Sequence, residues 1–216
     1  MAVNAETTFT VKATKDGMAD SAEATFTYKA YKLVDKYVKA ESLANGDEVV
    51  AFNKDNGMAL SSTILSSYYL TTVAATVTED TLTADSMDTI VWAVTKNENG
   101  TYTFKQGDKT LGASSGTNSK GKTVYNLNVT GTGSSTWDLT SCNEENHSYY
   151  LSANGMKGSY GNIYIEYFVY TNNKTGAKTP EFTAFDAGPS KLTEAAFGFE
   201  FYKKTQDKEY VSGGET

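Results

Sequence analysis

The sequence consists of short runs of alternating apolar and polar residues, separated by turn-forming residues. The clearest run is "IYIEYFVYT" at 163–171, and "TIVWAVTK" at 89–96 and "AAFGFEFYKK" at 195–204 follow the same pattern. Alternation with a period of two is typical of β-strands, and helical spacing of apolar residues is almost absent. The strands and turns recur roughly every 8–12 residues, which is typical of barrels and sandwiches. We therefore expect an all-β fold, a closed or partly open β-barrel.

A faint internal repeat indicates which type of barrel this could be. The stretches "DNGMALSS", "GDKTLGASS" and "SYYLSANG" each place a leucine after a turn and before small residues. These leucines are Leu60, Leu111 and Leu151, spaced roughly 40 to 50 residues apart. A threefold repeat of this length favours a trefoil-like barrel.

The first thirty residues contain a separate hairpin. "TFTVKAT" at 8–14 alternates, "KDG" at 15–17 is a turn signal, and Ala24, Phe26 and Tyr28 share one face of the next strand. Two strands alone are only marginally stable in water. We therefore expect this hairpin to pack on another part of a larger protein.

Two connections stand out between the expected strands. "EDTLTADSMD" at 79–88 is predicted to be an acidic, polar connection. The segment "NNKTGAKTPEFTAFDAGPSKLT" at 172–193 is predicted to be long and irregular. Such inserts on a rigid scaffold are where specific contacts are commonly placed.

The charge of the chain argues against two classes of partner. The net charge is −7, and all 19 basic residues are lysines because the sequence has no arginine. An acidic, arginine-free surface repels nucleic-acid phosphates and anionic membranes. No run approaches the roughly 18 apolar residues of a membrane span. We expect no nucleic-acid partner and no membrane insertion.

The sequence offers little for catalysis. Its only histidine, His147, lies near its only cysteine, Cys142. They could form a Cys–His pair, but with no nucleophile motif a surface histidine beside a packed cysteine is the simpler interpretation. One Cys and one His are too few for zinc, while calcium near 79–88 stays open. We expect no enzyme activity and no cofactor.

The segment "TTFTVKATKDGMADSAEATFTY" resembles the closing hairpin of the immunoglobulin-like, chitobiase C-terminal-type repeat of bacterial surface and secreted proteins. The resemblance covers about 25 residues. It implies that residues 1–29 are the terminal β-hairpin of an incomplete immunoglobulin-like module. The chain would then be a monomeric fragment of a larger, multidomain protein.

Most of the remaining chain carries a second resemblance. "YKLV", "SLANGDEVVAF", "MALSS", "VWAVTKNENGTYTFKQGDKTLGASS", "TWDLT" and "FEFYKK" resemble an accessory β module of large secreted or cell-surface proteins of gut Firmicutes and Bacteroidetes. The resemblance implies a barrel-type binding module at 30–205, a linker or tail at 206–216, and a secreted or cell wall-attached location. These motifs specify strands and turns, and no ligand-contacting residue is carried over from them.

The tyrosines supply the candidate binding residues. A strand with Tyr164, Glu166 and Tyr170 on one face could be a central strand buried on both sides, which we favour, or an exposed ladder suited to a ligand. Tyrosine in loops of a rigid scaffold builds contact surface at low entropic cost. The candidates are Tyr68, Tyr69, Tyr149, Tyr160, Tyr164, Glu166 and Tyr170.

We therefore expect a non-catalytic binding or adhesion module of a bacterial protein. Its first expected partner is a carbohydrate, stacked on aromatic rings. The alternatives are a host surface protein, such as a mucin or an immunoglobulin, in which case the 172–192 loop would contribute, and a structural spacer between domains.

Overall fold

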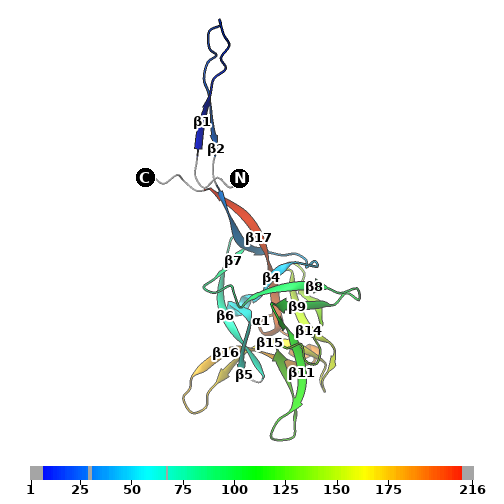
Figure 1. The fold of residues 1–216 in the computed structure, drawn as a ribbon. Helices are drawn as coiled ribbons and strands as arrows, with labels where there is room; N and C mark the ends of the chain where they lie inside the picture. The colour runs from blue at the N-terminus through cyan, green and yellow to red at the C-terminus, as the bar shows by residue number, and fades with distance from the viewer. Residues whose placement is uncertain (1–6, 29–30, 67, 211–216) are drawn as a thin grey trace. The chain divides into compact units, whose positions relative to one another are not determined.

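A computed structural model describes residues 7–28, 31–66 and 68–210 (Figure 1). Apart from one short α-helix and two 3₁₀ turns, its regular elements are strands, so the all-β prediction is confirmed. The described part contains no helix long and apolar enough to cross a membrane.

The described residues divide into two compact units. One comprises the described part of Met1–Lys36 with that of Thr205–Thr216, and the other comprises the described part of Tyr37–Lys204. Each is described by itself below.

The first unit contains the expected hairpin. Strands β1 (Thr7–Val11) and β2 (Ala24–Tyr28) pair antiparallel with Phe9 opposite Phe26. The "KDG" turn is present, since Met18 N–H donates to the Lys15 carbonyl at 3.0 Å and Gly17 has φ +76°. The side chains of Phe9 and Phe26 are more than half exposed, as is that of Val11.

The outer parts of two longer strands complete this unit. Strands β3 (Tyr31–Lys39) and β17 (Gly198–Tyr210) are neighbours in one sheet. Lys36 Nζ lies 2.6 Å from Asp207, and Lys32 lies 2.9 Å from Glu209. Strand β17 therefore extends five residues, 206–210, into the segment expected to be a linker or tail.

The second unit is a ring of hydrogen-bonded strands. β4 pairs with β8, and the ring continues through β9, β13, β14, β15, β16, β6 and β5 back to β4. Closing the ring gives every ring strand a partner on both sides over at least part of its length, which reduces the exposed sheet edges. The ring strands are β4 (Glu48–Asn53), β5 (Met58–Ser66), β6 (Tyr69–Thr78), β8 (Val91–Lys96), β9 (Tyr102–Gln106), β13 (Trp137–Asn143), β14 (Ser148–Lys157), β15 (Asn162–Thr171) and β16 (Lys178–Ala187).

Shorter elements attach to this ring. β7 pairs with β6 and β3, β10 extends β9, and β11 pairs with β12 as a separate two-stranded sheet. The helix α1 leads directly into β17. These elements are β7 (Thr81–Ala84), β10 (Lys109–Thr110), β11 (Gly112–Thr117), β12 (Thr123–Asn128), η1 (Lys54–Asn56), η2 (Pro189–Lys191) and α1 (Glu194–Phe197).

The core contains all three leucines of the internal repeat. Leu60, Leu111 and Leu151 are almost fully buried in one hydrophobic cluster. Trp92 Nε1 donates to the Leu60 carbonyl at 3.0 Å, and Trp137 Nε1 donates to the Leu111 carbonyl at 3.2 Å. Two of the three repeats thus use the same contact, an indole bound to a leucine carbonyl.

Two segments expected to be irregular contain strands. The segment 79–88 includes β7, and the segment 172–193 includes the ten-residue β16, which pairs with β15 along its whole length. Pro180 fits inside β16 because pairing with β6 starts only at Glu181, so the missing N–H removes no bond to that neighbour. The prediction of a long irregular loop is therefore wrong for 178–187.

Removing the buried charge of Glu200 should destabilise the ring. Glu200 is 1% exposed, and its carboxylate lies 3.0 Å from Lys39 Nζ, 3.3 Å from Lys54 Nζ and 2.8 Å from the Tyr202 hydroxyl. We expect Glu200→Gln to lower the unfolding free energy by about 2 kcal/mol, measured by urea denaturation, because it leaves the partly buried Lys39 without its charged partner.

The matched control is Glu48→Gln, which removes the ion pair between the exposed Glu48 and Lys204. It should change stability by less than about 1 kcal/mol. Equal effects of the two substitutions would contradict a special role for the buried carboxylate.

Candidate functional site

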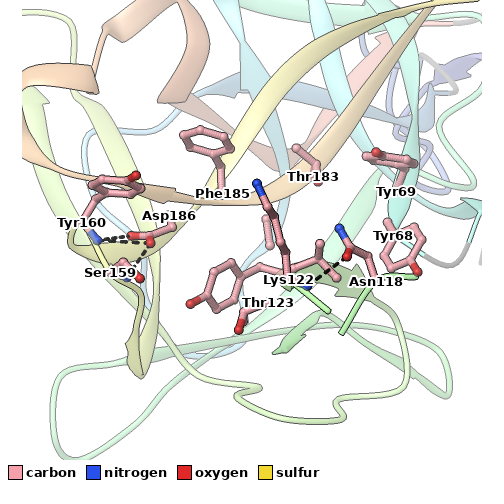
Figure 2. A pocket seen from close by; sticks show the side chains of 13 residues that line it. Tyr68, Tyr69, Asn118, Lys122, Thr123, Ser159, Tyr160, Thr183, Phe185 and Asp186 are labelled. Carbon is pink, nitrogen blue, oxygen red and sulfur yellow. Dashed lines mark hydrogen bonds between the residues drawn. The ribbon is translucent and has the colours of Figure 1, made fainter. Parts of the chain in front are cut away.

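A cleft of about 700 Å³ lies between the β11–β12 hairpin, strand β16, the β14–β15 loop and the β5–β6 turn. We call it the aromatic cleft, because five aromatic side chains line it: Tyr68, Tyr69, Tyr125, Tyr160 and Phe185. In Figure 2, Tyr160 and Tyr68 lie at opposite ends, with Phe185 and Lys122 between them.

Asp186 holds the loop that carries Tyr160. Its carboxylate accepts hydrogen bonds from the backbone N–H groups of Ser159 at 2.6 Å and Tyr160 at 3.1 Å (Figure 2). It also accepts one from the next N–H group, that of Gly161, at 3.0 Å. Charge-assisted bonds of this kind are stronger than neutral ones. The exposed Tyr160 ring is therefore carried on a loop fixed at its backbone.

The glycines of this loop are required by close packing. A Cβ on Gly158 would overlap the Asp186 carboxyl group, and one on Gly161 would overlap the Ala187 carbonyl. The sequence "GSYG" thus allows strand β16 to approach the loop backbone directly.

An asparagine turn shapes the opposite wall. Asn118 Oδ1 accepts from the N–H groups of Lys120 and Lys122, both at 3.0 Å, and Gly121 supplies the left-handed residue with φ +74°. This turn joins β11 to β12, whose Tyr125 lines the cleft.

The remaining wall comes from the β5–β6 turn. Tyr68 and Tyr69 pack edge to face with ring centroids 6.1 Å apart. Leu127 N–H donates to the Tyr68 carbonyl at 3.3 Å, which ties this turn to β12. Burial, and then the nearby Glu181 carboxylate, raise the pKa of the Tyr69 phenol, so it stays a neutral hydroxyl at physiological pH.

A second cleft of about 410 Å³ shares Tyr69 with the first. Its other lining residues are Leu65, Ser66, Tyr170, Thr179 and Glu181. We call it the Glu181 cleft. Burial raises the pKa of the Glu181 carboxyl group above its ordinary value.

The structure places four of the seven predicted site residues in these clefts. Tyr68, Tyr69 and Tyr160 line the aromatic cleft, and Tyr69 and Tyr170 line the Glu181 cleft. Tyr149, Tyr164 and Glu166 line neither of the two.

These three residues have other surroundings. The Tyr149 hydroxyl donates to the Glu41 carbonyl at 2.9 Å. The Tyr164 ring packs edge to face on Phe197, with centroids 6.2 Å apart. Glu166 is half-buried on β15 opposite Thr183, and burial raises its pKa to about 7.

Each of the two interpretations of the 163–171 strand, buried on both sides or exposed on one, holds for part of β15. Ile163 and Ile165 point into the core and are fully buried, whereas Phe168 and Tyr170 are more than two-fifths exposed. The strand is central, since it pairs with β14 and β16, but its outward face is covered only at one end.

Sequence reasoning missed Tyr125, Phe185 and Glu181 as lining residues. Phe185 and Glu181 lie in the segment taken as irregular, so their strand neighbours could not be assigned. Their alternation in "EFTAFDA" was the available signal: Glu181, Thr183 and Phe185 share one face, and Phe182 and Ala184 face the core.

The single cysteine is poorly suited to nucleophilic chemistry. Burial, and then the charge of Glu194, raise the pKa of the Cys142 thiol to about 11, so it is protonated at neutral pH. Within the described ranges, no group of three or more His, Cys, Asp and Glu side chains is placed to hold a metal ion.

Comparisons with known proteins give little further guidance. No protein-family model matches the chain, and no curated protein matches it. A solved structure similar to it is "Crystal structure of designed 3-fold symmetric protein, ThreeFoil", with a TM-score of 0.43 and 11% sequence identity, covering 71% of this chain and 96% of that one. At this level the similarity carries no argument about the site.

Asp186→Asn should loosen the loop that carries Tyr160. An amide accepts through only one oxygen and lacks the charge, so the amides of 159–161 should exchange with deuterium at least tenfold faster. The exposed Asp108 in the β9–β10 turn offers a control, and Asp108→Asn should leave those rates unchanged. Unchanged exchange in Asp186→Asn would show that the loop is held by other contacts.

Glu166 should make stability depend on pH. The folded state binds its proton up to about pH 7, whereas the unfolded chain releases it near its ordinary pKa of 4.5. Wild-type unfolding free energy should therefore fall as pH rises from about 4.5 to 7. Because solvent screens the half-buried Glu166, its contribution should reach about 2 kcal/mol, below the full value of the shift. Glu166→Gln should remove that part of the fall in denaturation series. If the unfolding free energies of the wild type and Glu166→Gln depended on pH in the same way, Glu166 would not be the cause of the fall.

Proposed function

We propose that the chain is a non-catalytic binding module of a secreted or surface-attached bacterial protein, and that the aromatic cleft binds a carbohydrate. The observation that carries the proposal is the set of five aromatic side chains around one cleft of about 700 Å³. Clefts of roughly 300–1,000 Å³ with aromatic walls and a few polar groups are typical ligand sites.

The chemistry of the walls supports a sugar. Aromatic rings present flat apolar surfaces, on which the C–H faces of a sugar ring can pack. Between them, Asn118, Lys122, Thr123 and Ser159 bring amide, ammonium and hydroxyl groups to the same cleft (Figure 2). These groups can hydrogen-bond to sugar hydroxyls, and the residues that line the cleft include one cation, Lys122, and one anion, Asp186, so the lining does not select a strongly anionic ligand.

The rigidity of the walls also supports binding. Tyr160 is 79% exposed, yet its backbone is held by Asp186, and the Lys122 backbone is held by Asn118. A preformed site loses less conformational entropy when the ligand binds. The location at the cell surface rests on the two sequence resemblances and is part of the same proposal.

The test is a glycan array followed by calorimetry with the strongest ligand. We expect Tyr160→Ala and Phe185→Ala each to weaken binding by about 5- to 20-fold, because each removes a ring from the cleft wall. Tyr149→Phe is the matched control, since it changes a tyrosine outside both clefts, and its affinity should equal that of the wild type.

Other results would favour the alternatives. If the chain bound no glycan but captured a purified mucin or immunoglobulin, the partner would be a host protein and not a carbohydrate. A folded chain that binds neither would be a spacer.

A further inference from the structure

Glu181 is a buried carboxylate with an unsatisfied oxygen. The residue is 2% exposed, and its Oε1 has no hydrogen-bond partner among the residues that the structure describes. Its neighbours across the sheet are Phe168 on β15 and Thr71 on β6, and neither carries a positive charge. Burying a carboxylate without a partner is costly, so such a group calls for a ligand that compensates it.

The carboxylate lies where a ligand can reach it. Glu181 lines the Glu181 cleft together with Tyr69 and Tyr170, and Leu65 adds an apolar wall. Tyr170 is 46% exposed, so this cleft opens to solvent beside a buried carboxyl group.

The chemistry of this cleft selects an ammonium group. A metal ion needs several ligands, and the described residues provide no cluster of three or more His, Cys, Asp or Glu. A neutral hydroxyl could donate to Oε1 but would leave the charge uncompensated. A compact ammonium ion both donates hydrogen bonds and neutralises the carboxylate, and tyrosine rings attract cations through their π faces.

We propose that the Glu181 cleft binds the ammonium group of an amino sugar whose neighbouring residues occupy the aromatic cleft. Tyr69 lines both clefts, so one chain of sugars can contact both. This inference rests on the proposed carbohydrate function and narrows its ligand to glycans with a free amine.

The experiment is calorimetry at pH 7 with three probes: a β-1,4-linked glucosamine tetramer, its fully N-acetylated form, and tetralysine. The wild type should bind the glucosamine tetramer about tenfold more tightly than the acetylated one. Glu181→Gln should abolish this difference by weakening only the glucosamine tetramer. This variant should remain folded, with an unchanged or higher melting temperature, because it removes an uncompensated buried charge.

Glu166→Gln is the matched control. It makes the same carboxyl-to-amide change on the adjacent strand, outside both clefts, and should keep the tenfold preference. If Glu181→Gln and Glu166→Gln lost this preference equally, general electrostatic attraction, and not the Glu181 cleft, would select the amine. That result would overturn the proposal.

The remaining outcomes separate this inference from the proposed function. If Glu181→Gln binds both tetramers as the wild type does, the ammonium site is wrong while carbohydrate binding stands. If neither tetramer binds but tetralysine binds in a Glu181-dependent way, the amino sugar is overturned in favour of a peptide amine. If both tetramers bind the wild type and Tyr160→Ala equally well, the aromatic cleft is not their site.

Discussion

Strand β16 is the element on which both the fold and the clefts depend. It pairs with β15 along ten residues and with β6 through Glu181, Phe182 and Thr183. The second pairing joins the two halves of the ring, so without it the sheet would have open edges. The same strand supplies lining residues to both clefts.

The alternation of a strand explains how one segment can serve both purposes. Phe182 and Ala184 point inward and are buried with Leu70 and the core phenylalanines. Glu181 and Phe185 point the other way, toward the two clefts. Because the side-chain period is two, inward packing fixes the register, and the register then fixes which residues face a ligand.

The clefts also depend on how loops are held against β16. Asp186, at the end of the strand, binds three N–H groups of the Tyr160 loop, and glycines remove the side chains that would block this approach. Across the cleft, Asn118 organises its own turn through local bonds. One wall is therefore fixed by contacts between distant segments, and the other by contacts within a few residues.

Local patterns in the sequence were sufficient for the all-β class and the "KDG" turn, because alternation and turn chemistry are properties of neighbouring residues. They also named Tyr68, Tyr69 and Tyr160 as tyrosines near turns, and Tyr170 as part of a face of the 163–171 strand that could be exposed. Tertiary structure alone decided that Tyr149 and Tyr164 pack elsewhere, that 178–187 pairs with both β15 and β6, and that Glu181 Oε1 is buried with no hydrogen-bond partner among the described residues. Those outcomes depend on which strands pair, and pairing joins residues too far apart in the chain for a local pattern to record.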